Sequence, residues 1–307
     1  MAKNPNKIRA KRVASDWAID IVTYVVIILV FVLVLYPFLN SLAISLNDAD
    51  DTLRGGLTIY PRNFTLKNYE NIFKNATIWR AYMITILRTV IGTVGGLLVT
   101  GAMAFALSRQ SLVFRKFYTI FFLVPMYFGG GLMPSYFLNI ALGFQNNFLV
   151  YIIPSLANIW NMILMRSYFS SLPEALEESA RIDGANYLTI FWKIYWPVST
   201  PIIATIALYF GVQHWNDWFT TSLYIRDETL RPMQNVLLSI VNEAQFAERM
   251  AAMGAAANIG DAAKGQRTNV RSITMASMIV TIIPIVVIYP FLQRYFIKGI
   301  MIGSVKG

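Results

Sequence analysis

The stretch SSLPEALEESARIDGANYLTIFWKIYWP, residues 170–197, combines two helical patterns separated by a glycine turn. Four charged residues recur at i, i+3, i+4 and i+7, which places them on one face of a short helix. They are Glu174, Glu177, Glu178 and Arg181. Asp183-Gly184 then breaks the helix, and residues 187–195 resume an apolar helical pattern. The stretch therefore predicts either a surface helix lying flat on a membrane or a projection that fits a cleft of another protein.

On both sides of this stretch, the sequence consists of long apolar runs. A membrane-spanning helix needs about 20 mostly apolar residues. The charge-free run 117–165 is too long for one span, and its middle contains the turn residues Gly129–Gly131, Pro134 and Gln145-Asn146-Asn147, so we divide it there. The predicted spans are about 19–46, 82–108, 118–138, 147–166, 197–219 and 272–293. The first is longer than the apolar region of a signal peptide, so we interpret it as an uncleaved anchor.

The composition agrees with a membrane protein. Of the 307 residues, 56% are hydrophobic and 14% are charged, and the mean hydropathy is +0.51. Soluble domains average about 45–50% apolar and about 25% charged. The absence of cysteine excludes disulfides and thiolate metal sites, and the single histidine excludes a histidine-based zinc site within the chain. We predict an all-α polytopic membrane protein with six transmembrane helices.

Lysine and arginine concentrate in four segments, which predicts their cytoplasmic location. These segments are 1–16, 108–116, 166–196 and 294–307. Almost all of the formal net charge of +10 therefore lies on one side of the membrane and indicates the orientation of the spans. Both termini are expected in the cytoplasm. The predicted organisation is a cytoplasmic tail, one transmembrane domain that contains the loop 170–196 and an outer loop, and a second cytoplasmic tail. Their ranges are 1–16 for the first tail, 17–296 for the domain, 223–271 for the outer loop and 297–307 for the second tail.

The loop 170–196 resembles the EAA loop of binding-protein-dependent ABC importer permeases. The family pattern is Glu-Ala-Ala, three residues, Gly, nine residues, then Ile-x-Leu-Pro. Here it reads Glu178-Ser179-Ala180, three residues, Gly184, nine residues, then Ile194-Tyr195-Trp196-Pro197. Ser179 and Trp196 depart from the pattern, which leaves the docking role intact because serine is small and an indole suits the membrane surface.

Further motifs resemble the carbohydrate branch of this family. They are Met165–Phe169, Ala180–Ala185, Trp215-Asn216 and Phe291–Gly299. Six spans and a short C-terminal tail are similar to the second permease subunit of the maltose-type system. The stretch Met126–Pro154, with its GGGLMP core, resembles a subgroup linked to complex plant or uronate-containing oligosaccharides.

The resemblance implies a type I ABC importer permease without enzymatic activity, located in a bacterial inner or plasma membrane. A second, homologous permease would share the translocation path. An ATPase dimer would bind ATP and Mg and take the loop into a groove, and an extracellular solute-binding protein would deliver an oligosaccharide. The implied ATPase-coupling residues are Glu178, Ser179, Ala180, Asp183 and Gly184. The tail 298–307 is a further expected contact with the ATPase. The chain itself would hold no cofactor and no metal, and no catalytic residues.

The expected substrate path involves residues at the end of the fifth span. Aromatic faces and hydrogen-bonding side chains suit a carbohydrate, and five consecutive residues supply both. They are His214, Trp215, Asn216, Asp217 and Trp218. Alternatively, they form an aromatic belt with polar tips in water. Arg88 is expected to extend to the outer interface, or alternatively to line the pathway. The small-residue stretch 250–258 is expected to pack on the outer surface, or alternatively to reach into the binding protein.

Other functions stay open at this point. An ABC permease for peptides or polyamines would share the EAA loop. An autonomous secondary carrier would be expected to show intramembrane acids or unwound helices in matched halves. A membrane-embedded enzyme or insertase would be expected to show intramembrane polar clusters. A Walker A phosphate loop is missing from the sequence, so ATP would have to be bound by another chain.

Overall fold

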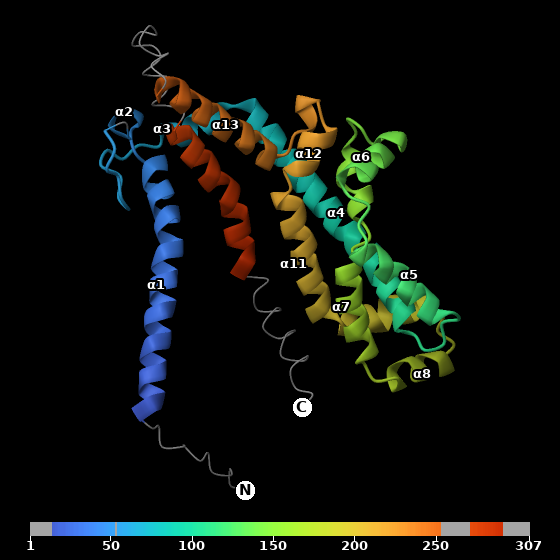
Figure 1. Cartoon of the computed structure of the whole chain (residues 1–307). Helices are drawn as coiled ribbons and strands as arrows, with labels where there is room; N and C mark the ends of the chain where they lie inside the picture. Colours follow the sequence, from blue (N-terminus) through green and yellow to red (C-terminus); the bar gives the residue numbers. More distant parts are fainter. Residues whose placement is uncertain (1–13, 53, 253–270, 291–307) are drawn as a thin grey trace. The chain divides into compact units, whose positions relative to one another are not determined.

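The computed structural model describes residues 14–52, 54–252 and 271–290, and their regular secondary structure is helical apart from one isolated bridge between Asn47 and Phe64 (Figure 1). Contacts between residues divide the chain into two units. The first contains residues 1–69 and 259–279, and the second contains residues 70–258 and 280–307. We describe each unit by itself.

The first unit contains a long apolar helix followed by a small polar cluster. Helix α1 spans Ala14–Ser45, α2 spans Ala49–Thr52, and α3 (Lys67–Lys74) begins in this unit. Asp51 accepts hydrogen bonds from Asn47 Nδ2 at 3.0 Å and from Arg62 Nε at 2.9 Å. Asn68 Nδ2 donates to the backbone carbonyl of Ser45 at 2.9 Å. These bonds fix the loop that follows α1.

Three helices form the centre of the second unit (Figure 1). They are α4 (Ala76–Ser108), α7 (Ile159–Ser170) and α11 (Thr200–Asn216), and α4 packs against both of the others. The remaining elements are α5 (Arg115–Tyr127), α6 (Leu132–Ala141), η1 (Phe148–Tyr151), η2 (Ile153–Ser155), α8 (Ala175–Ile182), α9 (Tyr187–Ile190), η3 (Phe191–Tyr195), α10 (Trp196–Val198), α12 (Phe219–Tyr224), η4 (Glu228–Leu230) and α13 (Met233–Ala252). The last described helix spans Arg271–Pro290.

Two glycines on α4 allow α11 to approach closely. A Cβ atom at Gly96 would lie 2.7 Å from the ring of Phe210, and one at Gly92 would lie 2.2 Å from His214 Nε2. Small residues at helix contacts are typical of membrane proteins, where close van der Waals packing drives association. The core beside this contact contains Phe105, Met165 and Phe210.

Three helices are long and apolar enough to cross a membrane, and three bent helix pairs bring the total to as many as six. The single helices are Trp17–Ser45, Ala76–Ser108 and Arg271–Pro290. The pairs are Arg115–Tyr127 with Leu132–Ala141, Phe148–Ser155 with Ile159–Ser170, and Tyr187–Val198 with Thr200–Asn216. This number by length and composition agrees with the six apolar runs of the sequence.

Bends divide three of the candidate spans. The first pair turns by 113° after Tyr127, where Gly129–Gly131 interrupt the helix and Gly131 has a φ of +83°. The third pair turns by 86° at Ser199. Apolar content alone does not report such bends, because both halves of a bent pair contribute to one continuous hydrophobic run.

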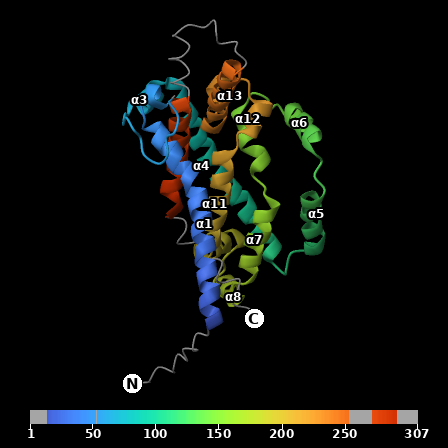
Figure 2. The same cartoon turned by 60° about the vertical axis from the view of Figure 1, so that its left-hand side comes forward.

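The two ends of the central helices carry different elements. Figure 2 shows α8 at one end of α7, and α12 and α13 at the opposite end. The loop 170–196 is therefore separated from the Asn216 end of α11 by the length of the central helices. The two groups of predicted functional residues lie at opposite ends of the second unit.

Candidate functional site: the α8 loop and the end of α11

Helix α8 is the short helix that the charge pattern of residues 170–197 predicts. It begins at Ala175, directly after Glu174, and Glu177 and Glu178 lie in its first turn, where the helix dipole favours acids. Arg181 in the last turn donates to Glu177 at 2.7 Å, as its i, i+4 spacing predicts. The sequence therefore specifies this helix locally.

Gly184 ends α8 in a left-handed turn with a φ of +78°. The amide of Gly184 donates to the carbonyl of Arg181 at 3.0 Å, and the amide of Ala185 donates to the carbonyl of Ala180 at 2.9 Å. These two bonds form a Schellman motif, which satisfies the last carbonyls of the helix. Glycine suits this position because it lacks the Cβ atom that disfavours a positive φ. Asn186 then begins α9 by accepting from the amide of Thr189.

The structure separates the predicted docking residues into an exposed group and a buried one. Glu178, Ser179, Asp183 and Gly184 are exposed. Ala180 is buried in the core at 7% exposure, so it positions α8. Ile182 is 87% exposed and adds an apolar side chain beside the exposed group. The exposed edge of α8 is thus partly acidic and partly apolar.

Arg109 holds α8 to the end of α4. Its guanidinium group forms an ion pair with Glu177, and the two side chains are only 10% and 12% exposed. Arg109 Nη1 also donates to the hydroxyl of Tyr195 at 2.8 Å. Beside this contact, a cavity of about 280 Å³ lies between α8 and the ends of α4 and α7. The sequence pattern did not single out Arg109, because an arginine that directly follows an apolar run does not by itself indicate a buried contact.

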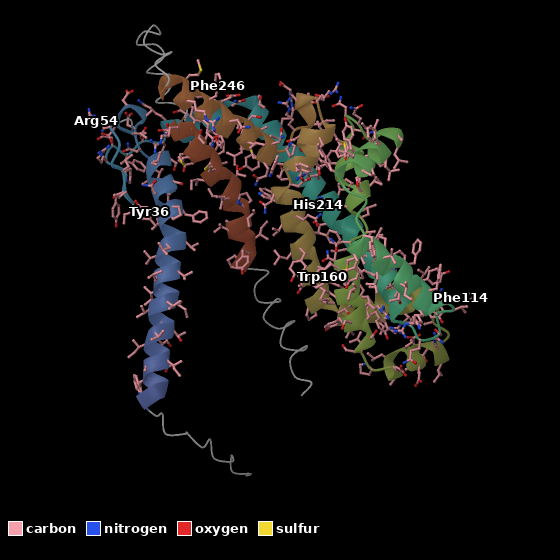
Figure 3. All side chains as sticks on the ribbon, in the orientation of Figure 1. Tyr36, Arg54, Phe114, Trp160, His214 and Phe246 are labelled. Carbon is pink, nitrogen blue, oxygen red and sulfur yellow. The ribbon has the colours of Figure 1, made fainter. Side chains whose placement is uncertain are left out.

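The five predicted substrate-path residues have different environments. His214 and Trp215 are buried at 4% and 7% exposure, Asp217 is partly buried, and Asn216 and Trp218 are exposed. Figure 3 shows His214 near the end of α11 that is farther from α8. Trp215 Nε1 donates to the carbonyl of Thr281 at 3.2 Å. The burial of His214 and Trp215 contradicts the aromatic-belt alternative for these two residues.

Arg88 is completely buried, and our expectation that it extends to the interface is wrong. Its guanidinium Nε donates to the backbone carbonyl of His214 at 2.7 Å, and Nη2 donates to that of Asp217 at 2.5 Å. The ring of Tyr151 lies 5.0 Å from the guanidinium carbon. The last carbonyls of a helix lack partners within it, and a cation there opposes the negative end of the dipole. Arg88 therefore joins α4 to the end of α11.

Two other predicted contact regions lie outside the described residues. They are the tail 298–307 and most of the stretch 250–258, because α13 ends at Ala252. Among the described residues, no group of three or more histidine, cysteine, aspartate or glutamate side chains has the arrangement of a metal site.

Known proteins resemble this chain over almost its full length. Residues 9–302 match the family described as "Binding-protein-dependent transport system inner membrane component". The polygalacturonan/rhamnogalacturonan transport system permease protein YtcP of Bacillus subtilis (strain 168) is 32% identical, with 94% of this chain and 98% of that protein covered. Protein LplC of the same organism is 35% identical, with 88% and 89% covered.

A solved structure shares the fold. It is a chain of a bacterial ABC transporter involved in the import of the acidic polysaccharide alginate, and it is 29% identical to this chain. The TM-score is 0.82, and the alignment covers 94% of this chain and 99% of that one. The agreement in length and fold indicates a common architecture over nearly all residues.

Proposed function

Because this chain belongs to the family of binding-protein-dependent transport system inner membrane components, we propose that it is one permease subunit of an ABC importer that takes up oligosaccharides. The chain is embedded in the membrane and is a transport permease rather than an enzyme. The exposed edge of α8, with its glycine-ended turn, is the observation that carries the proposal.

The α8 edge is proposed as the docking surface for an ATPase subunit. Four of the predicted docking residues are exposed together at one end of the central helices: Glu178, Ser179, Asp183 and Gly184. Ala180 packs into the core and holds α8 in position. An acidic, partly apolar helix edge suits a groove that offers a cation and an apolar floor. ATP and Mg²⁺ would be held by that ATPase. The α8 end, with both chain termini, would then lie in the cytoplasm, as the lysine and arginine distribution predicts.

A second, homologous permease and an extracellular solute-binding protein complete the proposed complex. No residue of α5 is buried within its unit, so its apolar side chains are free to pack against a further membrane helix. Asn216 and Trp218 are the exposed members of the predicted substrate path. Their side chains offer a hydrogen-bonding amide and an aromatic face, which suit a sugar. The backbone carbonyls of His214 and Asp217 accept hydrogen bonds from Arg88, and Trp215 Nε1 donates to the carbonyl of Thr281. These three residues therefore also hold the end of α11 in place.

We propose uronate-containing oligosaccharides as the substrate class. The similarity to YtcP, whose name refers to polygalacturonan and rhamnogalacturonan, supports this choice, as does the fold shared with an alginate importer chain. The test is uptake of labelled oligogalacturonates by the native host, compared with a strain in which this gene is deleted. Neutral arabino-oligosaccharides serve as the control substrate.

The proposal predicts that the deletion abolishes oligogalacturonate uptake, that the wild-type gene restores it, and that arabino-oligosaccharide uptake is unchanged. Unchanged oligogalacturonate uptake in the deletion strain would overturn the substrate class. Loss of peptide or polyamine uptake instead would place the chain in another branch of ABC importers.

A further inference from the structure

We propose that Arg109 is a positioning residue that transmits movement of α8 to α4 and to the segment preceding α11. This inference rests on the proposed function, in which an ATPase moves α8. Arg109 is the residue directly after α4, and its side chain touches elements from three parts of the chain. Its polar contacts reach Glu177 of α8, Tyr195 of η3 and Ser108 of α4.

The guanidinium group of Arg109 has charged, polar and aromatic partners. The guanidinium forms the ion pair with Glu177 of α8 and donates to Tyr195 Oη of η3 at 2.8 Å. Its carbon lies 4.3 Å from the ring centroid of Tyr195 and 4.8 Å from that of Phe105. Arg109 also donates to Ser108 Oγ at 3.0 Å and 3.1 Å. The planar group is therefore fixed by rings and by acceptors at once.

Burial distinguishes this ion pair from the others around α8. Exposed pairs contribute little, because water screens them and the side chains lose conformational freedom. The pair between Arg181 and Glu177 is of that kind, since the Arg181 side chain is 44% exposed. The Arg109 and Glu177 side chains are 10% and 12% exposed. Removing Glu177 leaves the shielded Arg109 cation with neutral acceptors only, whereas removing Arg109 leaves Glu177 with its more exposed partner Arg181. The shielded contact with Arg109 therefore resists separation better than the exposed one.

The position of the contact gives it a mechanical consequence. Tyr195 is 1% exposed and ends η3, which leads through α10 into α11. At its other end, α11 is held to α4 by Arg88. A displacement of α8 that pulls on Glu177 therefore acts on α4 directly and on the start of α11 through Tyr195. Packed helices shift as rigid elements, so a firm contact at their ends passes a displacement of α8 to both.

The test uses two fluorescent reporters in the complex of this chain with its permease partner, ATPase and binding protein in proteoliposomes. The chain has no cysteine, so Ala175→Cys places one label on α8 and Arg80→Cys places one on the far end of α4. Both positions are exposed. A complex without either substitution gives the background. ATP is added, and the fluorescence change at each position is measured for the wild type, Arg109→Gln, Arg109→Lys, Glu177→Gln and the double variant Arg109→Gln/Glu177→Gln.

We expect ATP to change the signal at α8 in every variant, because Arg109 lies outside the docking edge. In Arg109→Gln and Glu177→Gln, the fluorescence change at α4 should fall about tenfold. The double variant should be no worse than either single one, because both remove the same contact. Arg109→Lys should retain part of the signal through its charge. Lys116→Gln removes an exposed charge from α5 and is the matched control, with no expected effect.

A wild-type α4 signal in Arg109→Gln and Glu177→Gln would overturn the inference and leave the proposed function intact. Losses that add in the double variant would also overturn it, because the two side chains would then act separately. If ATP fails to change the α8 signal in the wild-type complex, the proposed docking of an ATPase at α8 is itself wrong. Glu177→Gln preserves side-chain shape, so it keeps the test valid if the Arg109 variants do not fold.

Discussion

The guanidinium group of Arg88 donates to the backbone carbonyl of His214 at 2.7 Å, which joins the middle of α4 to the last turn of α11. The side chain of Arg88 is completely buried, and Asp217 contributes both a carbonyl acceptor at 2.5 Å and a carboxylate 3.7 Å away. A buried cation is expensive in a membrane protein unless such acceptors surround it. Arg88 is therefore a structural connection between two central helices.

Arg88→Met should destabilise the protein by on the order of 3 kcal/mol, because it leaves two helix-end carbonyls without a donor in a buried site. The measurement is the melting temperature of the detergent-solubilised chain by fluorescence-detected size exclusion. Arg80→Met, on the exposed side of α4, is the control and should cost about 0.5 kcal/mol or less. Equal melting temperatures for Arg88→Met and the wild type would show that the contacts of Arg88 do not contribute to stability.

Gly92→Ala should weaken the contact between α4 and α11. Its added Cβ atom would lie 2.2 Å from His214 Nε2, so the imidazole or the helix must shift, at a cost of about 1–3 kcal/mol. Gly211→Ala is the matched control on the facing helix, because its Cβ atom would meet its nearest neighbour, Thr93 Oγ1, at 3.8 Å. There, higher helix propensity should raise stability by up to about 1 kcal/mol. Thermal melts of both variants test this, and the opposite order of stability would contradict the packing.

Substitutions at Gly184 should separate turn geometry from clearance at the docking surface. A Cβ atom there meets nothing within 4 Å, so this chain itself has room for a side chain. Asn tolerates the left-handed conformation, whereas Trp does not. Gly184→Asn should therefore change the stability of the isolated chain by no more than about 1 kcal/mol, so its melting temperature should stay close to that of the wild type. Gly184→Trp should lower it.

Both Gly184 variants should nevertheless lose the ATPase in a co-purification, because each adds bulk where a partner must approach closely. Retention of the ATPase by Gly184→Asn together with its loss from Gly184→Trp would show that turn geometry alone governs docking. Retention by both would place the partner away from Gly184.

The polar cluster after α1 should be sensitive to acid. The hydrogen bond from Asn47 is the largest influence that holds the pKa of Asp51 below its usual value of 3.8, and Arg62 adds to it. A carboxylate with a lowered folded-state pKa contributes stability above its unfolded pKa and loses it as the pH falls through the folded value. We expect protease resistance of the loop at residues 46–69 to be retained at neutral pH, to begin to fall only below the usual carboxyl pKa of 3.8, and to be lost once the pH falls below the lowered folded-state pKa of Asp51.

Asp51→Asn should show reduced protease resistance already at neutral pH, with little further loss on acidification. The exposed Asp50→Asn is the control and should behave like the wild type. If Asp51→Asn and the wild type have the same pH profile, the carboxylate does not stabilise the loop.

The sequence predicts the local features of this protein well. The charge spacing around Glu177 and Glu178 predicts α8, and the structure confirms both the helix and the glycine turn that ends it. The number of apolar runs agrees with up to six spans. These features depend on short-range patterns, namely helical periodicity, hydropathy and the conformational freedom of glycine.

The contacts that connect the helices could not be predicted in the same way. Arg88 meets His214, and Arg109 meets Glu177, only after distant segments have packed together. A single arginine beside an apolar run is compatible with a snorkelling side chain or with a buried one, and the sequence does not distinguish them. The turn residues Gly129–Gly131 do mark the first bend in the sequence, whereas the 86° bend at Ser199 has no glycine to indicate it.

The docking of an ATPase on α8 is most directly tested by co-purification from the native host, with this chain tagged and expressed together with its neighbouring genes. Glu178→Lys reverses an exposed charge on α8, and Glu228→Lys, 79% exposed in η4 near the opposite end, is the matched control. We predict that both variants retain the second permease and that only Glu178→Lys loses the ATPase, by about tenfold or more. Equal amounts of ATPase with Glu178→Lys, Glu228→Lys and the wild type would contradict the assignment of α8 as the coupling surface.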